Sequence, residues 1–210
     1  SRGLGDVYKR QLLAGMIGLI SVVSANAQFD QYFWEKTMRF DFYHCGDQNT
    51  QSYFFDELKE EPYWAGSKVS LIDDNGYGNQ LFKLVDEASG KLIYSRSYCT
   101  LFNEWQTTPE AAETMKCMPE SVVFPFPKKD ARLELYARNR KGKFEKKFEY
   151  SIRVNSYFIK RFTPRYETFE VVYNGNPDHR IDLVLLPEGY SAMEKEKFMT
   201  ACKVFAEEFF

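Results

Sequence analysis

The sequence predicts a mainly β protein, an antiparallel β-sandwich with a small helical insertion, followed by the first β-α unit of an α/β domain. Three observations favour this fold class. Aromatic residues make up 17% of the chain, and short runs of alternating apolar and polar residues, separated by turn signals, extend from residue 38 to 172. The pattern then changes after a segment rich in Asn, Gly and Pro.

Composition narrows the function classes. Hydrophobic residues are 44% and charged residues 28% of the 210 residues, which excludes intrinsic disorder and a multi-span membrane protein. The formal net charge is -2, with 28 basic against 30 acidic residues, so no overall positive field attracts nucleic acid. We therefore expect a folded protein with no nucleic-acid partner.

The segment before Gln28 is expected to be absent from the mature protein. Residues 6–11 are what one reading frame of a common transposase adaptor encodes, so we interpret residues 1–11 as non-native read-through; the alternative is the basic start of a signal peptide. Residues 12–27 read as the signal peptide, because an uncharged apolar run too short to span a bilayer leads to a small-x-small pattern ending at Ala27. Cleavage between Ala27 and Gln28 predicts an exported protein, periplasmic or extracellular, with no membrane span after cleavage.

Residues 28–173 are expected to form the sandwich. Its strands are expected where apolar and polar residues alternate between turn signals. They are residues 38–44, 81–86, 91–95, 131–138, 144–154 and 166–173. Two loops between them contain Gly90 and Gly142, and glycine accepts the positive φ of a tight turn, which predicts two hairpins.

Helical signals interrupt the sandwich pattern once. Residues 101–105 read as one turn of helix. A second turn is expected after Thr108, which would supply the N-cap, with Pro109 at the first helical position. These two turns are the predicted helical insertion.

The chain changes character after residues 174–180, which read as a linker. Residues 181–210 begin with a nearly continuous apolar run, typical of a strand covered on both faces. Ser191 is expected to N-cap the amphipathic helix that follows, with Glu194 completing a capping box. A strand, a turn and a helix are typical of the start of an α/β domain, and we expect this domain to continue beyond Phe210.

The cysteines predict bridging rather than catalysis. Cys45, Cys99 and Cys117 lie in the predicted sandwich and are candidates for a disulfide, whose pairing the sequence leaves open. A zinc site built from these cysteines with His44 is disfavoured, because the sequence has no C-x-x-C pair. Cys202 reads as a small apolar residue of the last helix.

Three further features are candidate sites with plainer interpretations. Trp64 and Trp105 are candidates for surface binding of protein or glycan by stacking, and the alternative is core packing. Residues 73–79 resemble a calcium loop but lack the glutamate that closes an EF-hand, which favours an Asx-rich turn. The basic residues between 138 and 147 are typical of a solvated strand edge protected by lysine.

Three segments carry a family resemblance: residues 63–67 (YWAGS), 101–106 (LFNEWQ) and 181–191 (IDLVLLPEGYS). By their order and spacing, the chain resembles the secreted zinc metallopeptidases grouped with the bacterial IgA peptidases, in the form common among gut Bacteroidetes. The resemblance implies a β-rich N-terminal domain followed by a catalytic domain, of which residues 181–210 would be the truncated start.

The resemblance also implies a function for the parent protein. Such enzymes hydrolyse protein or peptide substrates with zinc held on an H-E-x-x-H helix. Neither His44 nor His179 is followed by Glu, so no catalytic or metal residue is assigned to this chain, and zinc is expected only in the full-length parent. The expected role is a non-catalytic N-terminal portion that positions substrate or supports the catalytic domain. The alternative is an exported β-sandwich module for binding or adhesion to protein or glycan.

Overall fold

The computed structural model describes residues 28–163, 166–176 and 180–209. The chain divides into two compact units between Phe162 and Thr163. The expected read-through, signal peptide and cleavage residue Ala27 lie outside the described residues, as do residues 177–179 of the expected linker. Gln28, the expected mature N-terminus, lies in a short helical segment over residues 28–32.

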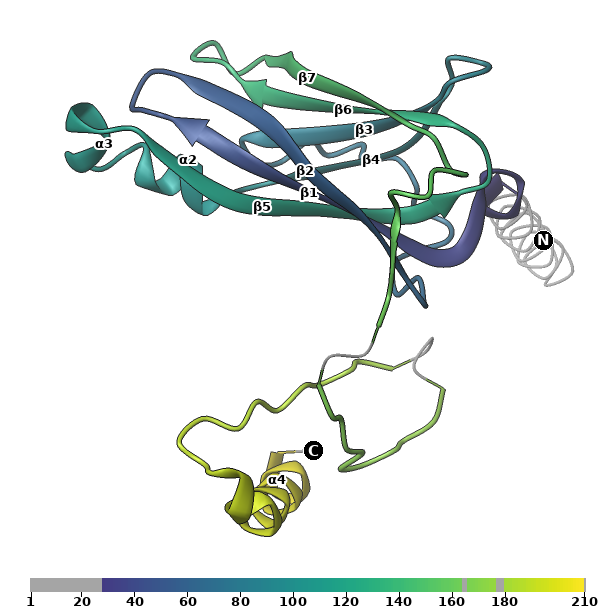
Figure 1. Cartoon of the computed structure of the whole chain (residues 1–210), viewed down its shortest axis with the longest axis vertical. Helices are drawn as coiled ribbons and strands as arrows, with labels where there is room; N and C mark the ends of the chain where they lie inside the picture. Colours follow the sequence, from purple (N-terminus) through teal and green to yellow (C-terminus); the bar gives the residue numbers. More distant parts are fainter. Residues whose placement is uncertain (1–27, 164–165, 177–179, 210) are drawn as a thin grey trace, which may run out of the picture. The chain divides into compact units, whose positions relative to one another are not determined.

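The first unit is a sandwich of two four-stranded sheets, the two layers of Figure 1. One sheet has the order β5-β1-β2-β8, with bounds Lys116–Pro127, Phe33–Gly46, Gln51–Glu61 and Lys160–Arg161. The other has the order β4-β3-β6-β7, with bounds Leu92–Tyr98, Gln80–Asp86, Ala131–Arg138 and Phe144–Ile152. Neighbouring strands pair antiparallel, except that β8 runs parallel to β2. The predicted β-sandwich is confirmed.

Strand β1 shows how alternation builds the core. Met38, Phe40 and Phe42 are at most 1% exposed and face the second sheet, as side chains two residues apart on a strand must share a face. Leu84 and Leu133 are fully buried on the opposing sheet. Complete burial of each such side chain stabilises the fold by about 1.5–3 kcal/mol.

Both predicted hairpins are present. Gly90 joins β3 to β4 with a φ of 69°, and Gly142 joins β6 to β7 with a φ of 75°. The four strands that these hairpins join agree with the expected ones to within three residues at each end. Turn chemistry therefore predicted this half of the sandwich correctly.

The pattern of alternating apolar and polar residues did not predict strands β2 and β5. In β2 the pairing slips, since Asp41 lies opposite Glu57 and Phe42 opposite Phe55, which leaves Asp56 as the extra residue of a bulge. The bulge breaks the period of two. Strand β5 carries three prolines, which a strand tolerates at the edge of a sheet, where β5 lies.

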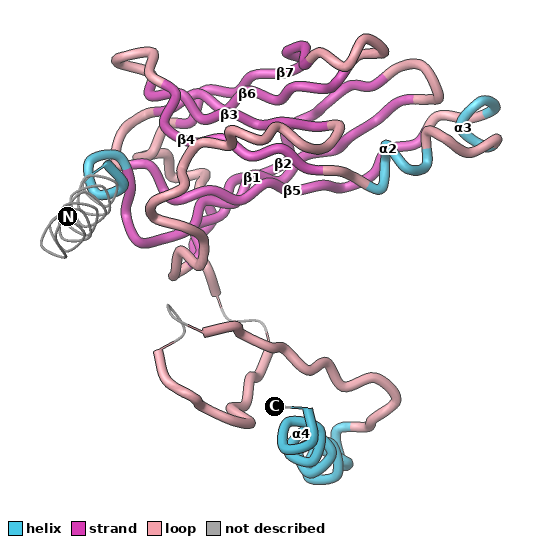
Figure 2. Tube along the Cα trace, turned by 180° about the vertical axis from the view of Figure 1, so that it is seen from behind, coloured by secondary structure: helices cyan, strands magenta, loops and turns pink. Residues whose placement is uncertain are grey.

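The helical insertion consists of α2 (Leu101–Trp105) and α3 (Glu110–Glu113), which lie beyond one end of the strands (Figure 2). Thr100 caps α2 by accepting a hydrogen bond from the backbone N–H of Asn103. The predicted N-cap at Thr108 is wrong. The cap of α3 is Pro109, because the Thr108 hydroxyl instead donates to the carbonyl of Trp105 at 2.7 Å.

The second unit contains α4 (Lys195–Phe209), preceded by the 3-10 turn η2 (Ala192–Glu194). The predicted capping box is confirmed, because the side chains of Ser191 and Glu194 each accept from the other's backbone N–H, with the Ser191 N–H donating to Glu194 at 3.0 Å. Cys202 is 4% exposed, as expected for an apolar position of this helix. Among the described residues, no helix has the length and apolar character that crossing a bilayer requires.

Two predicted strands are absent from the described part of the second unit. Residues 166–173 and 181–186 have no regular secondary structure, and Ile181 and Leu186 are 96% and 80% exposed. A strand needs a neighbour to pair its backbone groups, and no described strand pairs with either segment. The apolar composition of residues 181–186 therefore predicted a strand that has no partner among the described residues.

Candidate functional site

Trp64 and Trp105 do not form a binding surface. Each side chain is only 8% exposed, so neither offers the ring face that stacking on a ligand requires. The Trp64 ring lies edge-on to Tyr94 with centroids 5.8 Å apart, within the main core. The Trp105 indole N–H donates to a carboxylate oxygen of Glu110 at 2.9 Å, which joins α2 to α3. The surface-binding prediction is therefore wrong, and the core-packing alternative describes both residues.

Trp64 is held by its own loop. A Cβ atom on Gly66 would lie 2.3 Å from the Trp64 ring, so only glycine permits this contact. The Trp64 indole N–H donates to the carbonyl of Ser67 at 3.3 Å, and Thr37 of β1 donates to the carbonyl of Tyr63 at 2.5 Å. The YWAGS segment is thus a packing element of the sandwich.

Helix α2 closes one end of the sandwich over His44. The imidazole of His44 is fully buried and stacks between Phe102 of α2 and Tyr53 of β2, with centroid distances of 3.9 and 4.4 Å. Phe102 is also fully buried. The LFNEWQ segment therefore covers the end of β1 with the Phe102 ring.

A buried polar network surrounds this histidine. His44 Nε2 lies 3.0 Å from Gln51 Oε1, which also accepts from the side-chain amide of Gln80 at 3.1 Å. Gln80 donates in turn to Asn103 of α2 at 2.8 Å, and Asn103 donates to Gln106 at 3.0 Å. These bonds tie β1, β2, β3 and the helical insertion together, which satisfies amide groups that burial would otherwise destabilise.

The geometry of the network fixes one proton. The Gln51 oxygen can only accept, so His44 Nε2 carries a hydrogen. His44 Nδ1 lies 3.1 Å from Glu120 Oε1 of β5, and this contact requires a proton on either the ring nitrogen or the carboxyl group. Burial first, and the nearby charge of Glu120 second, raise the pKa values of Tyr53 and Tyr98. The His44–Glu120 contact is a buried hydrogen bond that joins β1 to β5.

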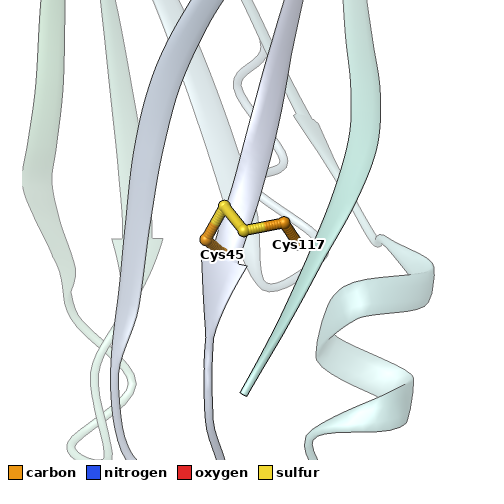
Figure 3. Close-up of a disulfide and its surroundings, with 2 residues drawn as sticks. All are labelled: Cys45 and Cys117. Carbon is orange, nitrogen blue, oxygen red and sulfur yellow. A yellow bond between two sulfur atoms is a disulfide. The ribbon is translucent and has the colours of Figure 1, made fainter.

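The sandwich disulfide lies next to this network but on the opposite face of its sheet. Cys45 and Cys117 occupy facing positions of β1 and β5 and form a bridge with Cα atoms 4.0 Å apart (Figure 3). Cys99 keeps a free, exposed thiol. His44 and Cys45 are neighbours on one strand and point to opposite faces, so they cannot bind one ion. Paired in the bridge, Cys45 and Cys117 do not carry the thiolates that bind zinc.

The loop that resembles a calcium site uses its carboxylate internally. Asp73 accepts from the backbone N–H groups of Asn75 and Gly76, and its second oxygen accepts from the backbone and hydroxyl of Ser97. Burial alone would raise the pKa of Asp73, but these hydrogen bonds outweigh burial and lower it to about 2. The Asp73 carboxylate therefore has all these hydrogen-bond donors within the chain, as we expect for an Asx-rich turn.

The basic segment around β7 is balanced by local acids. Lys146 pairs with Glu149 at 2.7 Å and Lys147 with Glu145 at 3.0 Å. The Arg138 guanidinium donates to backbone carbonyls, including that of Gly78 at 2.9 Å. Strand β7 lies at the edge of its sheet, where lysine is expected.

An open groove of about 340 Å³ lies where β2 and β7, from different sheets, approach each other. Its apolar lining includes Phe55 of β2, Tyr150 of β7 and Phe158 of the connection between β7 and β8. The Phe55 and Tyr150 rings stack with centroids 4.2 Å apart, which bridges the two sheets. Pattern analysis did not find this groove, because its two walls are about a hundred residues apart in the sequence.

Among the residues that the structure describes, no group of three or more His, Cys, Asp or Glu side chains gathers in a way that could hold a metal ion. We derive no catalytic step from these residues.

Comparison with known proteins identifies the sandwich. Residues 28–149 match the family model of the peptidase M64 N-terminus, and no curated protein matches the chain. The matched segment is more than half of the chain and includes the helical insertion, the disulfide and most of both sheets. The chain therefore belongs to the peptidase M64 N-terminus family.

Proposed function

We propose that this chain is the non-catalytic N-terminal portion of an exported, zinc-dependent endopeptidase that resembles the IgA peptidases. Its sandwich would position substrate or support the catalytic domain. The observation that carries the proposal is the match of residues 28–149 to the N-terminus of a peptidase family. The partner would be a protein or peptide substrate, not nucleic acid.

The second unit supports the same proposal. Residues 181–186 and α4 expose large apolar side chains, among them Val184 at 76% and Leu186 at 80% exposure. Apolar faces of this kind are typical of elements that pack against more of their own domain. The proposal assigns the zinc ligands and the catalytic residues to sequence that follows them.

The Cys45–Cys117 bridge supports export. Disulfides persist in oxidising compartments such as the periplasm or the extracellular space, and are rare in the reducing cytosol. The apolar run and the small-x-small pattern ending at Ala27 point the same way. We therefore propose a periplasmic or extracellular location.

The alternative is a module that binds protein or glycan without a catalytic partner. Burial of Trp64 and Trp105 counts against the stacking that a glycan site would use. The groove beside Phe55 combines aromatic side chains with charged ones such as Asp56 and Lys160, which fits a peptide ligand that carries both apolar and charged side chains. Such a ligand is equally consistent with the peptidase proposal, in which it would be the substrate.

The test is to sequence the source locus beyond both ends of this reading frame and to express the longer chain that it encodes. We expect an H-E-x-x-H motif downstream, and proteolysis of a denatured protein substrate that a chelator abolishes and zinc restores. A matched chain of residues 28–210 is the control, and should bind no stoichiometric zinc and cleave nothing. A stop codon soon after Phe210, or a different downstream domain, would refute the peptidase proposal.

A further inference from the structure

We propose that the groove between β2 and β7 binds an extended polypeptide, which adds as a strand to the free edge of β2. The polypeptide would place one large apolar side chain against Phe55, Tyr150 and Phe158, next to a basic side chain. This inference rests on the proposed function only in identifying the polypeptide as a substrate of the parent peptidase.

The first observation is the pairing state of the β2 edge. The chain itself pairs with this edge, but only at two positions, where β8 places Lys160 opposite Lys59 and Arg161 opposite Glu60. Over residues 51–58 no described strand lies along that edge. Backbone donors and acceptors left unpaired at a sheet edge are a template for an added strand. The short β8 shows that a strand fits alongside β2 in a parallel direction.

The length of the free edge sets the size of the ligand. Eight residues at about 3.3 Å each span roughly 26 Å, enough for a strand of about eight residues. The connection from β7 to β8 contributes Ser156 and Phe158 to the lining of the groove.

The second observation is the apolar wall. Phe158 is 73% exposed and Phe55 is 37% exposed, although both line the groove. Phe55 already stacks on Tyr150, so its position is fixed before any ligand binds. A large apolar side chain of an added strand would cover these rings and remove them from water.

The third observation is the charge around the groove. Lys160 pairs with Glu57, and Arg153 pairs with Asp130 at 2.9 Å, so these charges are balanced within the chain. The bulged and exposed Asp56 forms none of the ion pairs found among the described residues. Charge complementarity therefore favours a lysine or arginine in the ligand beside its apolar side chain.

The test uses the chain from Gln28 to Phe210 and a defined probe. The probe is a blocked, fluorescein-labelled octapeptide of alternating threonine and valine, with a central phenylalanine next to a lysine. Fluorescence anisotropy measures its affinity, and hydrogen exchange of residues 51–58 reports whether a strand is added. We expect saturable binding, slower exchange of β2 amides, and binding about a hundredfold weaker when alternate peptide nitrogens are methylated, because the edge hydrogen bonds are lost.

Two variants and one matched control locate the site. Phe158→Ala should weaken binding about tenfold through lost apolar contact, and Asp56→Lys about fivefold through reversed charge. Asp74→Lys makes the same charge change in an exposed loop outside the groove and should leave the affinity unchanged. Thermal unfolding of each variant should match that of the unmodified chain, since both changed side chains are exposed.

Three results would overturn the inference. They are no binding of the probe, binding that tolerates Asp56→Lys and Phe158→Ala, and exchange protection of residues 51–58 caused by a second copy of the chain, detected as a dimer by sedimentation. Failure of the peptidase proposal is distinguishable from these results. If the probe binds but the longer chain shows no proteolysis, the peptidase proposal is refuted and peptide binding in the groove stands. If the longer chain is proteolytic but the probe does not bind, only peptide binding in the groove is refuted.

Discussion

The Cys45–Cys117 bridge should contribute about 4 kcal/mol to the free energy of unfolding. The two cysteines are 72 residues apart, and the chain-entropy relation for a loop of that length gives about 4 kcal/mol at 25 °C. They face each other in the register of β1 and β5, so the strand pairing would persist without the bond. Replacing both cysteines with alanine should therefore destabilise the fold mainly by increasing the conformational entropy of the unfolded chain.

Urea unfolding followed by tryptophan fluorescence measures this effect. All three tryptophans, Trp34, Trp64 and Trp105, lie in the first unit, so the signal reports the sandwich and not the second unit. With a slope of about 2 kcal/mol per M, the double variant should unfold at a urea concentration about 2 M lower. A change in the slope is expected as well, because the bridge compacts the unfolded state.

Cys99→Ser is the matched control. Its thiol is free and exposed, so this change should shift the free energy of unfolding by less than about 0.5 kcal/mol. Titration of free thiols should find Cys99 and Cys202 reactive after unfolding, and Cys45 and Cys117 only after reduction. An unchanged midpoint in the double variant would refute the stabilising role of the bridge.

His44→Phe should lower the free energy of unfolding by about 1–3 kcal/mol, because phenylalanine keeps the ring stack but leaves the buried carboxyl group of Glu120 without its hydrogen-bond partner; an unchanged urea midpoint would contradict this role of the histidine. Asp73→Asn should unfold more readily than the unmodified chain at neutral pH, with a difference that vanishes on acidification. The pKa of Asp73 is about 2 in the folded state, below the value of about 3.9 in an unfolded chain, so its stabilisation is complete above about pH 4 and lost as the pH falls through 2. Urea midpoints across this range measure it, and a difference that persists at the acid end would contradict the cause. Gly66→Ala should cost about 1–3 kcal/mol, since its Cβ would lie 2.3 Å from the Trp64 ring, and an unshifted midpoint and emission maximum would show that the ring yields freely.

Local sequence was enough where neighbouring residues decide the structure. Gly90 and Gly142 set two hairpins because each supplies a positive φ in a short loop. Ser191 and Glu194 set the start of the last helix because their side chains reach each other's backbone across one turn. In these cases the physical cause lies within five residues of sequence.

Local sequence was insufficient where the structure depends on strand register. The choice of Cys117 over Cys99 as the partner of Cys45 follows from the alignment of β5 on β1. The same alignment brings Glu120 to His44. Neither contact is visible in a single run of residues, because each joins positions more than seventy residues apart.

Composition alone also misjudged three segments. The apolar run at 181–186 has the residues of a buried strand but no described strand beside it, so the strand does not form there. Trp64 and Trp105 have the residue type of a binding surface, yet packing buries them. Residue type limits what a side chain can do, and its neighbours in space determine which of those roles it takes.

The two sandwich segments that carry the family resemblance act in packing and not in chemistry. Residues 63–67 fold the Trp64 ring onto Gly66, and residues 101–106 place Phe102 and Asn103 on the buried network at the end of β1. A match to such segments identifies the scaffold, because these residue types are demanded by the contacts they make. Substitutions in them should reduce function only as far as they reduce stability. A test of function must therefore change exposed positions of the groove, such as Asp56 and Phe158, whose replacement alters a contact with a ligand and leaves the core intact.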